Sequence, residues 1–462
     1  MAEVRKIDKL VNLAKRRGFI FPAAEIYGGL NSLYDYGPLG VELKNNIKKA
    51  WWDAMLSRPD IVGLDSAILT PGIVWEASGH LQSFHDPLVE CKKCHHRFRA
   101  DHLLEAKKAE PGYAKEQPTS IKDINCPDCD GPLTTPRNFN LLMKTSLGVV
   151  EEEKEEAYLR GETCQGIYLN FLNIKDTMRL RLPFGIAQVG KAFRNEITTK
   201  NFIFRMREFE QMEMQYFITE KIGKKVFAEW QKARFNWYVN FGIKPENLRW
   251  REHAKDELAH YAKQAIDIEY RFDFSDKDGF KELEGVHNRG NWDLSRHQEF
   301  SQQDFSVKDE HDKKFIPHII ETSGGVDRAT LAFLLDAYEE IEGGRTTTTE
   351  STKEVETILH LDKRLAPIKI AILPLSKKEP LVDVSKKIFT SLASKYRLQY
   401  DETAAIGRRY RRQDEIGTPY CVTVDFESSE DKKVTVRDRD SMRQDRVSIA
   451  ELNDYFDDKF KN

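Results

Sequence analysis

Two alternating segments around a short polar stretch form the most informative pattern in the chain. Each segment has one apolar face, carrying Ala187, Val189 and Phe193 on the first and Met212, Met214, Tyr216 and Ile218 on the second. The opposite faces carry Gln188, Gly190, Ala192, Arg194 and Glu196 on the first and Phe209, Gln211, Glu213 and Gln215 on the second. Successive side chains of a strand point to opposite faces, so we predict a β-hairpin whose apolar faces enter a core. The arginine, carboxylates and phenyl ring predict a floor for a charged, planar ligand.

A helical period follows the breaker at residues 37–40. Apolar residues recur at helical spacing at positions Leu43, Ile47, Trp51 and Met55. We therefore predict a helix over 42–55 with one buried face. A strand is predicted over 65–70, and it ends at Pro71-Gly72 because that pair breaks regular structure. From residue 86 to 136 the periodicity fades and Cys, His, Lys and Pro dominate, which is typical of an insertion.

The pattern of apolar and polar residues changes near residue 365. The pattern predicts strands over 368–373, 420–426 and 433–437 and helices over 382–396 and 448–460. The Gly- and Thr-rich stretch 343–352 precedes them and is predicted to be a linker. These elements together predict a separate, small α/β domain.

Composition narrows the class of protein. The 462 residues are 40% hydrophobic and 32% charged, which is ordinary for a globular chain long enough for two or three domains. The net charge of -3 provides no global attraction for nucleic acid, so any such binding must depend on local patches. No apolar run approaches the length of a membrane span, and the first 18 residues lack an apolar signal core. We therefore expect a cytoplasmic protein with no membrane partner.

Four of the six cysteines form two CxxC pairs, Cys91/Cys94 and Cys126/Cys129, with Gly131 after the second. Each pair places two thiolates on one turn, and two turns complete a tetrahedron, so we predict a structural Zn²⁺ in a zinc ribbon. His95 and His96 are reserve ligands. The alternatives are reduced thiols without metal and, less readily with two pairs present, a redox CxxC.

Arginines cluster in the C-terminal domain, at Arg408, Arg409, Arg411 and Arg412 around Tyr410, and again at Arg437, Arg439 and Arg443. Arginine interleaved with an aromatic ring suits phosphate contacts and base stacking on a single-stranded nucleic acid. The alternative is a solvated helix face, as for most charge runs.

Several segments together resemble the class II aminoacyl-tRNA synthetases. The segment 193–196 with 207–209 resembles motif 2, Glu321–Arg328 resembles motif 3, and 37–71 resembles motif 1. Four segments are similar in sequence to glycyl-tRNA synthetases of the homodimeric type: 34–40, 185–197, 365–369 and 434–440. The resemblance covers almost the whole chain, and it departs from the family pattern at Gly161 and Cys164.

The resemblance implies an α/β and α+β multidomain protein. A class II synthetase catalytic domain built on an antiparallel sheet with flanking helices is expected over 1–86, which includes motif 1, and 149–345, which includes motifs 2 and 3. A zinc-ribbon-like insertion is expected over 87–148, a linker over 346–364, and a C-terminal α/β anticodon-binding domain with a mixed sheet over 365–462.

The activity implied by the resemblance is that of a glycine–tRNA ligase. It would activate glycine with ATP and Mg²⁺ to glycyl-adenylate and transfer glycyl to the 3′-terminal ribose of tRNA(Gly). Arg194 and Arg328 are the expected catalytic residues, because a fixed guanidinium stabilises charge on a reacting phosphate. Glu282 is a candidate Mg²⁺ ligand. The implied ATP-binding residues are Arg194, Asn195, Glu196, Phe204, Arg205, Met206, Arg207, Glu208, Phe209, Glu282, Leu283, Gly325, Val326, Asp327 and Arg328.

The resemblance also implies a glycine site and a set of partners. Glu162 is expected to bind the ammonium group and Arg289 the carboxylate. Glu210 falls on the apolar side of its strand, so Glu213 is the stronger substrate contact. The expected partners are glycine, ATP, tRNA(Gly) and a second copy of the chain. The implied glycine-binding residues are Arg99, Glu162, Phe209, Glu210, Gln211, Met212, Glu213, Arg289, Glu321, Thr322, Ser323, Gly324 and Gly325.

Three other functions compete with this hypothesis. A non-catalytic relative that binds nucleic acid or assists a polymerase would be expected to lose Arg194, Arg328 and Glu162, and all three are present. The four segments that are similar to glycyl-tRNA synthetases, and the concentration of acidic residues in the expected pocket, argue against a class II synthetase for another amino acid. A zinc-dependent nucleic-acid-binding protein would explain only the insertion.

Overall fold

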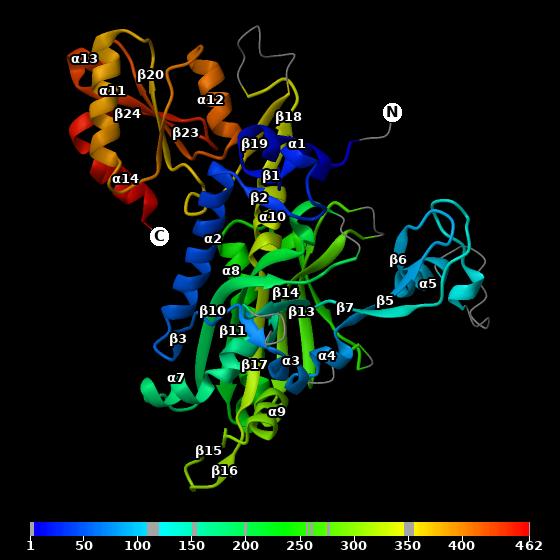
Figure 1. The fold of residues 1–462 in the computed structure, drawn as a ribbon. Helices are drawn as coiled ribbons and strands as arrows, with labels where there is room; N and C mark the ends of the chain where they lie inside the picture. Colours follow the sequence, from blue (N-terminus) through cyan, green and yellow to red (C-terminus); the bar gives the residue numbers. More distant parts are fainter. Residues whose placement is uncertain are drawn as a thin grey trace.

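The computed structural model describes residues 4–108, 120–149, 155–197, 201–255, 257–258, 262–274, 278–345 and 355–461 (Figure 1). A large body surrounds a central sheet. A small lobe projects from this body on extended strands, and a C-terminal lobe adjoins the body at one end, where Arg17 pairs with Glu415. None of the described helices combines the length and the apolar character needed to cross a membrane.

The central sheet has seven strands in the order β12-β13-β14-β17-β11-β10-β3. All neighbours are antiparallel except β10 and β3, which confirms the expected antiparallel architecture. The hairpin is confirmed too, because β10 and β11 pair from Phe184 with Phe217 to Phe193 with Glu208. The strands are β3 Ile61–Gly63, β10 Phe184–Phe193, β11 Glu208–Ile218, β12 Leu248–Glu252, β13 Gln264–Arg271, β14 Phe280–Gly290 and β17 His318–Gly325.

Three long helices pack against one face of this sheet: α2 (Pro38–Leu56), α8 (Gly223–Asn240) and α10 (Val326–Ala337). The predicted helix is confirmed, because Leu43, Ile47, Trp51 and Met55 of α2 are all buried. They share one core with Met212, Met214, Tyr216 and Ile218 of β11. The predicted apolar face of that strand is therefore the inner face.

The opposite face of the sheet is only partly apolar. Near Phe184 and Phe217 it packs against α6 (Cys164–Leu169), α7 (Phe171–Thr177) and α9 (Trp292–Ser301). Farther along, polar side chains are buried with specific partners, as where Gln188 Nε2 donates to the carbonyl of Thr163 at 3.0 Å. The polar face predicted from the alternation is thus built into the interior.

The strand predicted over 65–70 is wrong for most of its length. Only β4 (Leu69–Pro71) is a strand, and residues 64–67 have no regular structure. The backbone groups of Ser66 bond to side chains instead: its N–H donates to Gln188 Oε1 at 2.8 Å, and its carbonyl accepts from Arg160 Nη1 at 2.7 Å. Two polar side chains from elsewhere in the chain therefore replace a strand partner.

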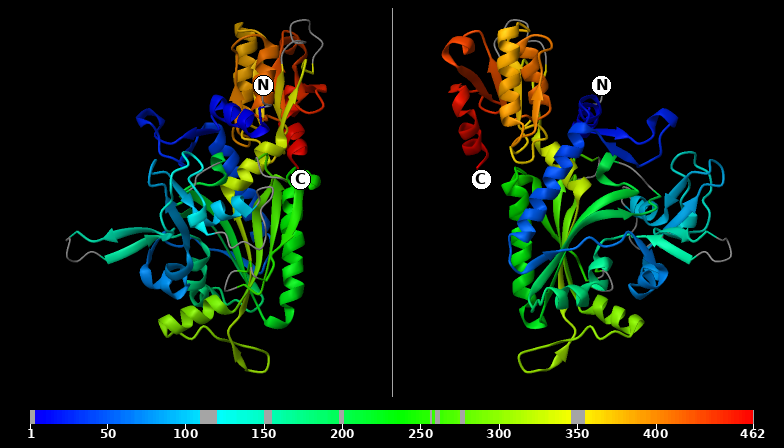
Figure 2. Two further views of the ribbon diagram at one scale, coloured as in Figure 1. Left: turned by 90° about the vertical axis from the view of Figure 1, so that its right-hand side faces the viewer. Right: turned by 60° about the vertical axis from the view of Figure 1, so that its left-hand side comes forward.

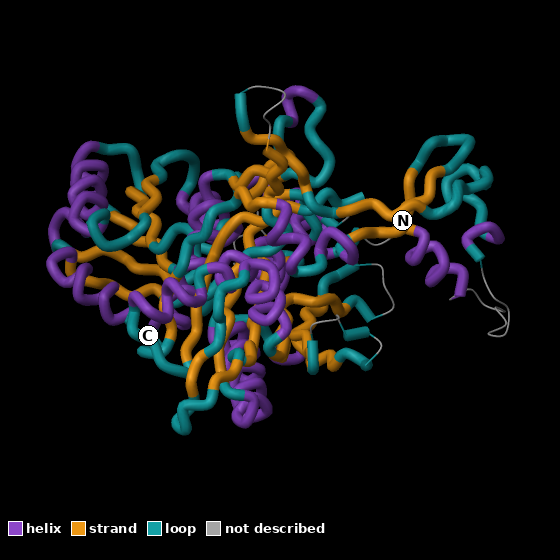
Figure 3. Tube along the Cα trace, turned by 60° about the horizontal axis from the view of Figure 1, so that its bottom comes forward, coloured by secondary structure: helices purple, strands orange, loops and turns teal. Residues whose placement is uncertain are grey.

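The projecting lobe corresponds to the predicted insertion. It contains a three-stranded sheet in the order β6-β5-β7, and β5 and β7 connect it to the body (Figure 3). Residues 143–147 form β8, which pairs with β9, and β9 pairs with β4 of the body. The elements are β5 His85–Glu90, β6 Arg97–Arg99, α5 Ala100–Lys108, β7 Arg137–Asn140, β8 Met143–Leu147 and β9 Glu155–Leu159.

The C-terminal lobe contains a mixed five-stranded sheet in the order β21-β20-β22-β23-β24, as predicted (Figure 2). Strands β20, β21 and β22 are parallel, and β22, β23 and β24 are antiparallel. The predicted linker partly lies in residues 346–354, outside the described residues, and 356–359 form β19. The elements are β20 Ile370–Pro374, α11 Glu379–Leu392, β21 Leu398–Tyr400, α12 Ile406–Glu415, β22 Tyr420–Val424, α13 Ser428–Asp431, β23 Lys433–Asp438, β24 Gln444–Ser448 and α14 Leu452–Phe460.

Short elements complete the body. The N-terminal helix α1 packs into the main core through Ile7, Leu10 and Leu13. The hairpin β18–β19 leads from α10 to the C-terminal lobe. The remaining helices and strands are α1 Lys6–Arg17, β1 Ile20–Pro22, β2 Tyr34–Tyr36, α3 Gly72–Ala77, α4 His80–Ser83, β15 Val307–Lys308, β16 Lys314–Phe315, β18 Tyr338–Ile341 and β19 Glu356–Leu359.

Candidate active site

A pocket of about 190 Å³ lies among β11, β14, β17, the start of α10 and the segment 194–206. Glu162, Glu213 and Glu321 lie at one end together with Arg289, and Arg194, Arg205 and Arg328 lie at the other end together with Glu196 and Glu282. Only two of the lining residues, Ile203 and His287, are absent from the predicted set. The pocket is lined by Glu162, Arg194, Glu196, Ile203, Phe204, Arg205, Met206, Phe209, Gln211, Glu213, Glu282, His287, Arg289, Glu321, Ser323, Gly325, Asp327 and Arg328.

Glu162 is held by a ring of donors just before α6. Its Oε1 accepts hydrogen bonds from Cys164 Sγ at 3.0 Å and from Gln165 Nε2 at 2.9 Å, and it lies 3.3 Å from His80 Nε2. Burial acts to raise the pKa of Glu162, but His80 and then Arg289 outweigh it, so the pKa lies well below its usual range. This carboxylate is therefore ionised and fixed in position.

Glu213 lies beside it on the polar face of β11. It accepts hydrogen bonds from Thr163 Oγ1 at 2.6 Å and from Ser323 Oγ at 2.7 Å. Burial, followed by the charges of Glu321 and Glu162, raises the pKa of Glu213 to about 7. This end of the pocket thus concentrates negative charge to the point that one carboxyl group holds its proton near neutrality.

The third carboxylate, Glu321, is paired with cations. Arg289 Nη1 donates to Glu321 Oε2 at 3.0 Å, and His287 Nδ1 lies 2.7 Å from Glu321 Oε1. The same arginine donates to both oxygens of Asp293, at 2.8 and 2.9 Å. Burial opposes ionisation of Glu321, but Arg289 and His287 lower its pKa. The prediction that Arg289 binds the substrate carboxylate needs correction: three of its N–H groups are used by the two acids.

Arg194 is the principal cation at the opposite end. It follows β10 directly, and its Nε donates to the carbonyl of Gly161 at 2.9 Å. Its guanidinium carbon lies 5.1 Å from the ring centre of Phe84 and 5.4 Å from that of Phe209. Among the described residues, no carboxylate forms an ion pair with it. The two aromatic rings and one carbonyl therefore orient a guanidinium whose terminal N–H groups are available to an anion.

Gly161 and Cys164, the two departures from the family pattern, both have local roles. A side chain at Gly161 would place its Cβ 2.9 Å from Leu142 Cδ2, so glycine lets the backbone pass here without moving that leucine. Its carbonyl then reaches Arg194, and the thiol of Cys164 donates to Glu162. Both departures are thus consistent with a fixed Glu162.

Arg328 lies on the first turn of α10, as motif 3 predicted. Its Nη1 lies 3.0 Å from Glu282 Oε2, and its guanidinium carbon is 4.5 Å from the ring centre of Phe204. Glu282 is half-exposed, so solvent weakens this ion pair. Arg205 lies 3.5 Å from Glu196 at the same end. These pairs can exchange for ligand groups at little cost.

Ten predicted residues do not line the pocket. Seven lie on β11, β14, β17 or α10. The six on strands alternate with lining residues, as the period of two dictates, and Val326 at the start of α10 is buried in the main core. Glu210 pairs with Lys44 and Lys48, and Arg99 pairs with Asp86 in the insertion lobe. The ten residues are Arg99, Asn195, Arg207, Glu208, Glu210, Met212, Leu283, Thr322, Gly324 and Val326.

Several supporting residues carry no signal in the sequence. His80 and Phe84 lie on or beside the short helix α4, and they contact Glu162 and Arg194. No periodicity in 79–84 points to a site. His287 is the exception. It lies two residues before Arg289 on β14, so the alternation of the strand could have suggested that it also lines the pocket.

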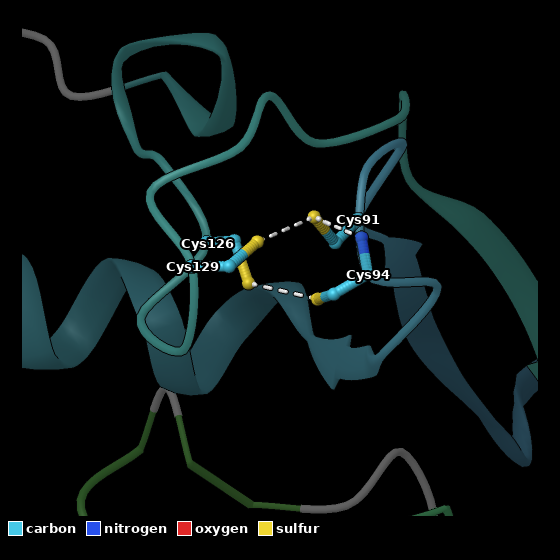
Figure 4. A group of neighbouring side chains, drawn as sticks. All are labelled: Cys91, Cys94, Cys126 and Cys129. Carbon is cyan, nitrogen blue, oxygen red and sulfur yellow. Dashed lines mark hydrogen bonds between the residues drawn. The ribbon is translucent and has the colours of Figure 1, made fainter.

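The four cysteines converge at the tip of the insertion lobe (Figure 4). Cys91 Sγ lies 3.5 Å from Cys129 Sγ, and Cys94 Sγ lies 3.6 Å from Cys126 Sγ. A tetrahedral Zn²⁺ with Zn–S distances of about 2.3 Å separates its sulfurs by about 3.8 Å, so the cluster fits this metal. The close thiols shift one another unequally: the backbone N–H of Cys94 lowers the pKa of Cys91 to about 6, whereas at Cys94 and Cys129 the backbone N–H donors are outweighed by burial and the neighbouring thiols, which raise the pKa.

The reserve ligands are used elsewhere. His95 lies 3.3 Å from a carboxylate oxygen of Glu90, and His96 lies 2.6 Å from one of Asp128. Gly131 is required beside the cluster, because a Cβ there would lie 3.0 Å from Cys91 Sγ. Four cysteines alone therefore form the candidate metal centre.

The C-terminal arginines are mostly not free for a ligand. Arg409 is buried and donates to the carbonyl of Pro374 at 2.5 Å, and Arg439 is buried and donates to the carbonyl of Gly417 at 2.7 Å. Arg412 pairs with Asp401. Arg409 and Arg439 therefore fit neither expectation for these runs, since they are buried and neither exposed to phosphates nor part of a solvated helix face.

Arg437 and Tyr410 are also committed inside the lobe. Arg437 donates from both terminal nitrogens to Asp414, at 2.9 Å each. The hydroxyl of Tyr410 lies 2.6 Å from Thr423 Oγ1, and Arg437 covers its ring at 4.8 Å. Of the arginines named in the two runs, Arg408 and Arg443 remain exposed.

Comparison with known proteins agrees with this architecture. Residues 145–338 match the family model "tRNA synthetase class II core domain (G, H, P, S and T)", and residues 369–459 match "Anticodon binding domain". A glycine–tRNA ligase of Thermobifida fusca is 50% identical over 458 residues, covering 98% of each chain. That of Streptomyces coelicolor is 51% identical over 454 residues, covering 97% of each chain.

A solved structure shares the fold at low identity. It is a prolyl-tRNA synthetase from Cryptosporidium parvum in complex with halofuginone and AMPPNP, with a TM-score of 0.63 and 15% identity, covering 99% of this chain and 78% of that one. The two glycine–tRNA ligases are about 50% identical to this chain over nearly its full length, which includes both predicted lobes and the pocket between motifs 2 and 3. This identity establishes the family. This chain belongs to the glycine–tRNA ligases.

Proposed function

We propose that this pocket activates glycine with ATP to glycyl-adenylate and pyrophosphate, and that the glycyl group then passes to the 3′-terminal ribose of tRNA(Gly). The observation that carries the proposal is the polarity of the pocket. Three carboxylates lie at one end, and at the other Arg194 has no carboxylate partner among the described residues. A zwitterionic amino acid next to a phosphate fits this separation of charge.

The acidic end is the proposed seat of the glycine ammonium group. Glu162 is ionised and fixed by three donors, so it presents a stable negative charge. Glu213 and Ser323 form the adjoining wall, and Glu321 adds charge behind it. Arg289 acts through Glu321, whose carboxylate it holds, instead of binding the substrate carboxylate.

The cationic end is the proposed ATP site. Phe209 lines the pocket and offers an aromatic face to the adenine ring. Glu196 lines the same end and is the proposed acceptor for the adenine amino group, in exchange for its pair with Arg205. Arg328 exchanges its half-exposed partner Glu282 for the γ-phosphate, aided by the N-terminus of α10. Glu282, freed from that pair, would hold Mg²⁺, whose charge neutralises the phosphates when it is bound.

In the first step a carboxylate oxygen of glycine attacks the α-phosphorus of ATP. The bond from that phosphorus to the oxygen bridging the α- and β-phosphates breaks, and pyrophosphate leaves with the electron pair. Arg194 stabilises the charge on the α-phosphate oxygens. In the second step a ribose hydroxyl of tRNA attacks the glycyl carbonyl, and AMP leaves.

The other parts of the chain have supporting roles in this proposal. The catalytic unit comprises 1–86 and 149–345, and the insertion 87–148 holds a structural Zn²⁺ through its four cysteines. After the linker 346–364, residues 365–462 bind the anticodon arm of tRNA(Gly), for which Arg408 and Arg443 remain available. The edge strand β3 in the motif 1 region is the proposed contact between two copies of the chain. The compartment is the cytosol, where tRNA is charged.

Glycine-dependent exchange of pyrophosphate into ATP tests the function directly. The purified protein is incubated with ATP, Mg²⁺ and labelled pyrophosphate, with glycine, alanine, serine or no amino acid. We expect label in ATP with glycine alone. A folded protein that gives no exchange with glycine, or equal exchange with alanine, would refute the proposal.

A further inference from the structure

The buried face of α2 contains a single charged side chain. Its other buried residues are Gly40, Leu43, Ile47, Trp51 and Met55, and the charged one is Lys44. An ammonium group in an apolar face is costly unless it is paired. Lys44 therefore needs acidic partners, and both of them come from elements other than α2.

Two carboxylates from distant elements hold the ammonium group. Lys44 Nζ lies 2.8 Å from Asp327 Oδ1 and 2.8 Å from Glu210 Oε2, and it lies 4.2 Å from the ring centre of Tyr36. Burial acts to lower the pKa of Lys44, but Asp327 and Glu210 raise it. Lys44 is thus a buried cation that links the motif 1 helix to motifs 2 and 3.

Asp327 transmits this contact to the pocket. Its Oδ1 also accepts from the hydroxyl of Tyr36 at 2.6 Å, and its Oδ2 accepts from the backbone N–H of Glu210 at 2.7 Å. It lines the pocket on the first turn of α10, directly before Arg328, and Glu210 directly follows Phe209. One carboxylate therefore fixes the start of β11 relative to the start of α10.

We propose that Lys44 is a positioning residue for ATP. By neutralising and orienting Asp327, it holds Arg328 and Phe209 at the spacing that one nucleotide requires. The inference rests on the proposed role of Arg328 and Phe209 in ATP binding. Without the ammonium group, the Asp327 carboxylate keeps only a hydroxyl and a backbone amide as donors within the part of the chain that the structure describes, and the joint between β11 and α10 loosens. The hydrogen bonds that hold the carboxylates of the glycine end involve none of Lys44, Asp327 and Glu210, so that end is left intact.

Lys48 is a matched control one turn farther along α2. It pairs with the other oxygen of Glu210, at 3.1 Å, and its side chain is 27% exposed compared with 7% for Lys44. No contact between Lys48 and Asp327 is present among the described residues. Lys44→Met and Lys48→Met remove the same charge from the same helix, but only the first disturbs Asp327.

The experiment compares the two variants with the wild type. The Kd for ATP is measured by equilibrium binding, and KM values for ATP and glycine are measured by pyrophosphate exchange. We expect Lys44→Met to raise the Kd and KM for ATP about tenfold and the KM for glycine less than about twofold. Lys48→Met should change all three less than about twofold. Equal effects of the two variants, or equal changes for ATP and glycine, would overturn the inference.

A double-mutant cycle with Asp327→Asn tests the route. If Lys44 acts through Asp327, Lys44→Met should change the Kd for ATP less than about twofold in the Asp327→Asn background. A full tenfold change there would show that Lys44 acts otherwise. If Lys44→Met does not fold, Tyr36→Phe removes the second bond to the same carboxylate oxygen. We expect it to weaken ATP binding about threefold and to leave glycine unaffected.

The binding measurement separates this inference from the proposed function. A wild type that binds ATP but gives no glycine-dependent exchange would refute the function, while the Kd values would still decide the role of Lys44. Normal exchange with unchanged ATP affinity in Lys44→Met would overturn the inference alone. A wild type that binds no ATP would overturn both.

Discussion

The arginines of the pocket and those of the C-terminal lobe have opposite environments. In the lobe, Arg409, Arg437 and Arg439 are buried and bonded to carbonyls or carboxylates. In the pocket, Arg194 is oriented by a carbonyl and two rings but has no carboxylate partner among the residues described. A saturated arginine stabilises its own domain, whereas an oriented arginine with unused donors can bind an anion. Clustering in the sequence does not distinguish the two.

Arg289 shows that position alone does not separate the two classes either. It lines the pocket, yet its contacts resemble those of Arg437, because it is buried and donates twice to one aspartate. Its second partner, Glu321, is the group that faces the pocket. The relevant property of each arginine is therefore the number of donors left after the fold has satisfied its own carboxylates.

The largest expected effect is on the stability of the C-terminal lobe. Arg437→Met leaves the buried carboxylate of Asp414 with Arg345 alone, so the free energy of unfolding should fall by about 3 kcal/mol or more. Urea unfolding measures it. The exposed Arg443→Met is the control and should change stability by less than about 0.5 kcal/mol. Similar losses in the two variants would contradict the contrast between buried and exposed arginines.

The next effect is on catalysis without loss of stability. Arg194→Ala should lower kcat/KM for pyrophosphate exchange by about 10²–10³-fold, because the charge on the reacting phosphate loses its guanidinium. Arg207→Ala removes a motif 2 arginine outside the pocket and should change the rate less than about threefold. Thermal unfolding of both variants should resemble that of the wild type. Near-normal exchange in Arg194→Ala would refute its role.

A smaller effect concerns the acidic end of the pocket. Folded Glu213 keeps its proton up to a pKa of about 7, and an unfolded glutamate loses it near 4.5. The folded state therefore binds more protons between these values, so the free energy of unfolding falls as pH rises through the window. Glu213→Gln cannot ionise, and its stability relative to the wild type should rise by on the order of 1–2 kcal/mol between about pH 5 and 8. Parallel stability curves would contradict the shift.

The smallest expected effect distinguishes Arg408 from its buried neighbour. Arg408→Ala should change the free energy of unfolding by less than about 0.5 kcal/mol, because the side chain is exposed. If the residue contacts a tRNA phosphate, the slope of log affinity against log salt should become shallower by about one unit. Filter binding of tRNA(Gly) at several salt concentrations measures the slope. An unchanged slope would exclude Arg408 from the phosphate contacts.

Local periodicity predicted the parts of the fold that depend on one segment. The buried face of α2 and both faces of β11 follow from their periods, and the paired CxxC turns converge as expected. The strand predicted over 65–70 failed because side chains of Gln188 and Arg160, far along the chain, bond to its backbone. Some site residues were predicted as continuous runs of the sequence. These runs included residues such as Glu210 and Met212, whose side chains point away from the pocket because successive side chains of a strand face opposite sides.

The sequence by itself determined the family resemblance, the alternation of the motif 2 strands, the helix of motif 1 and the cysteine pairs. The last three are matters of spacing within a short segment, where geometry fixes which side chains share a face. Only the tertiary structure decided which charges meet. Arg289 with Glu321, His80 with Glu162, and Lys44 with Asp327 join residues far apart in the chain. A buried charge is stable only when it is paired, but the local spacing of residues does not show which partner it will have.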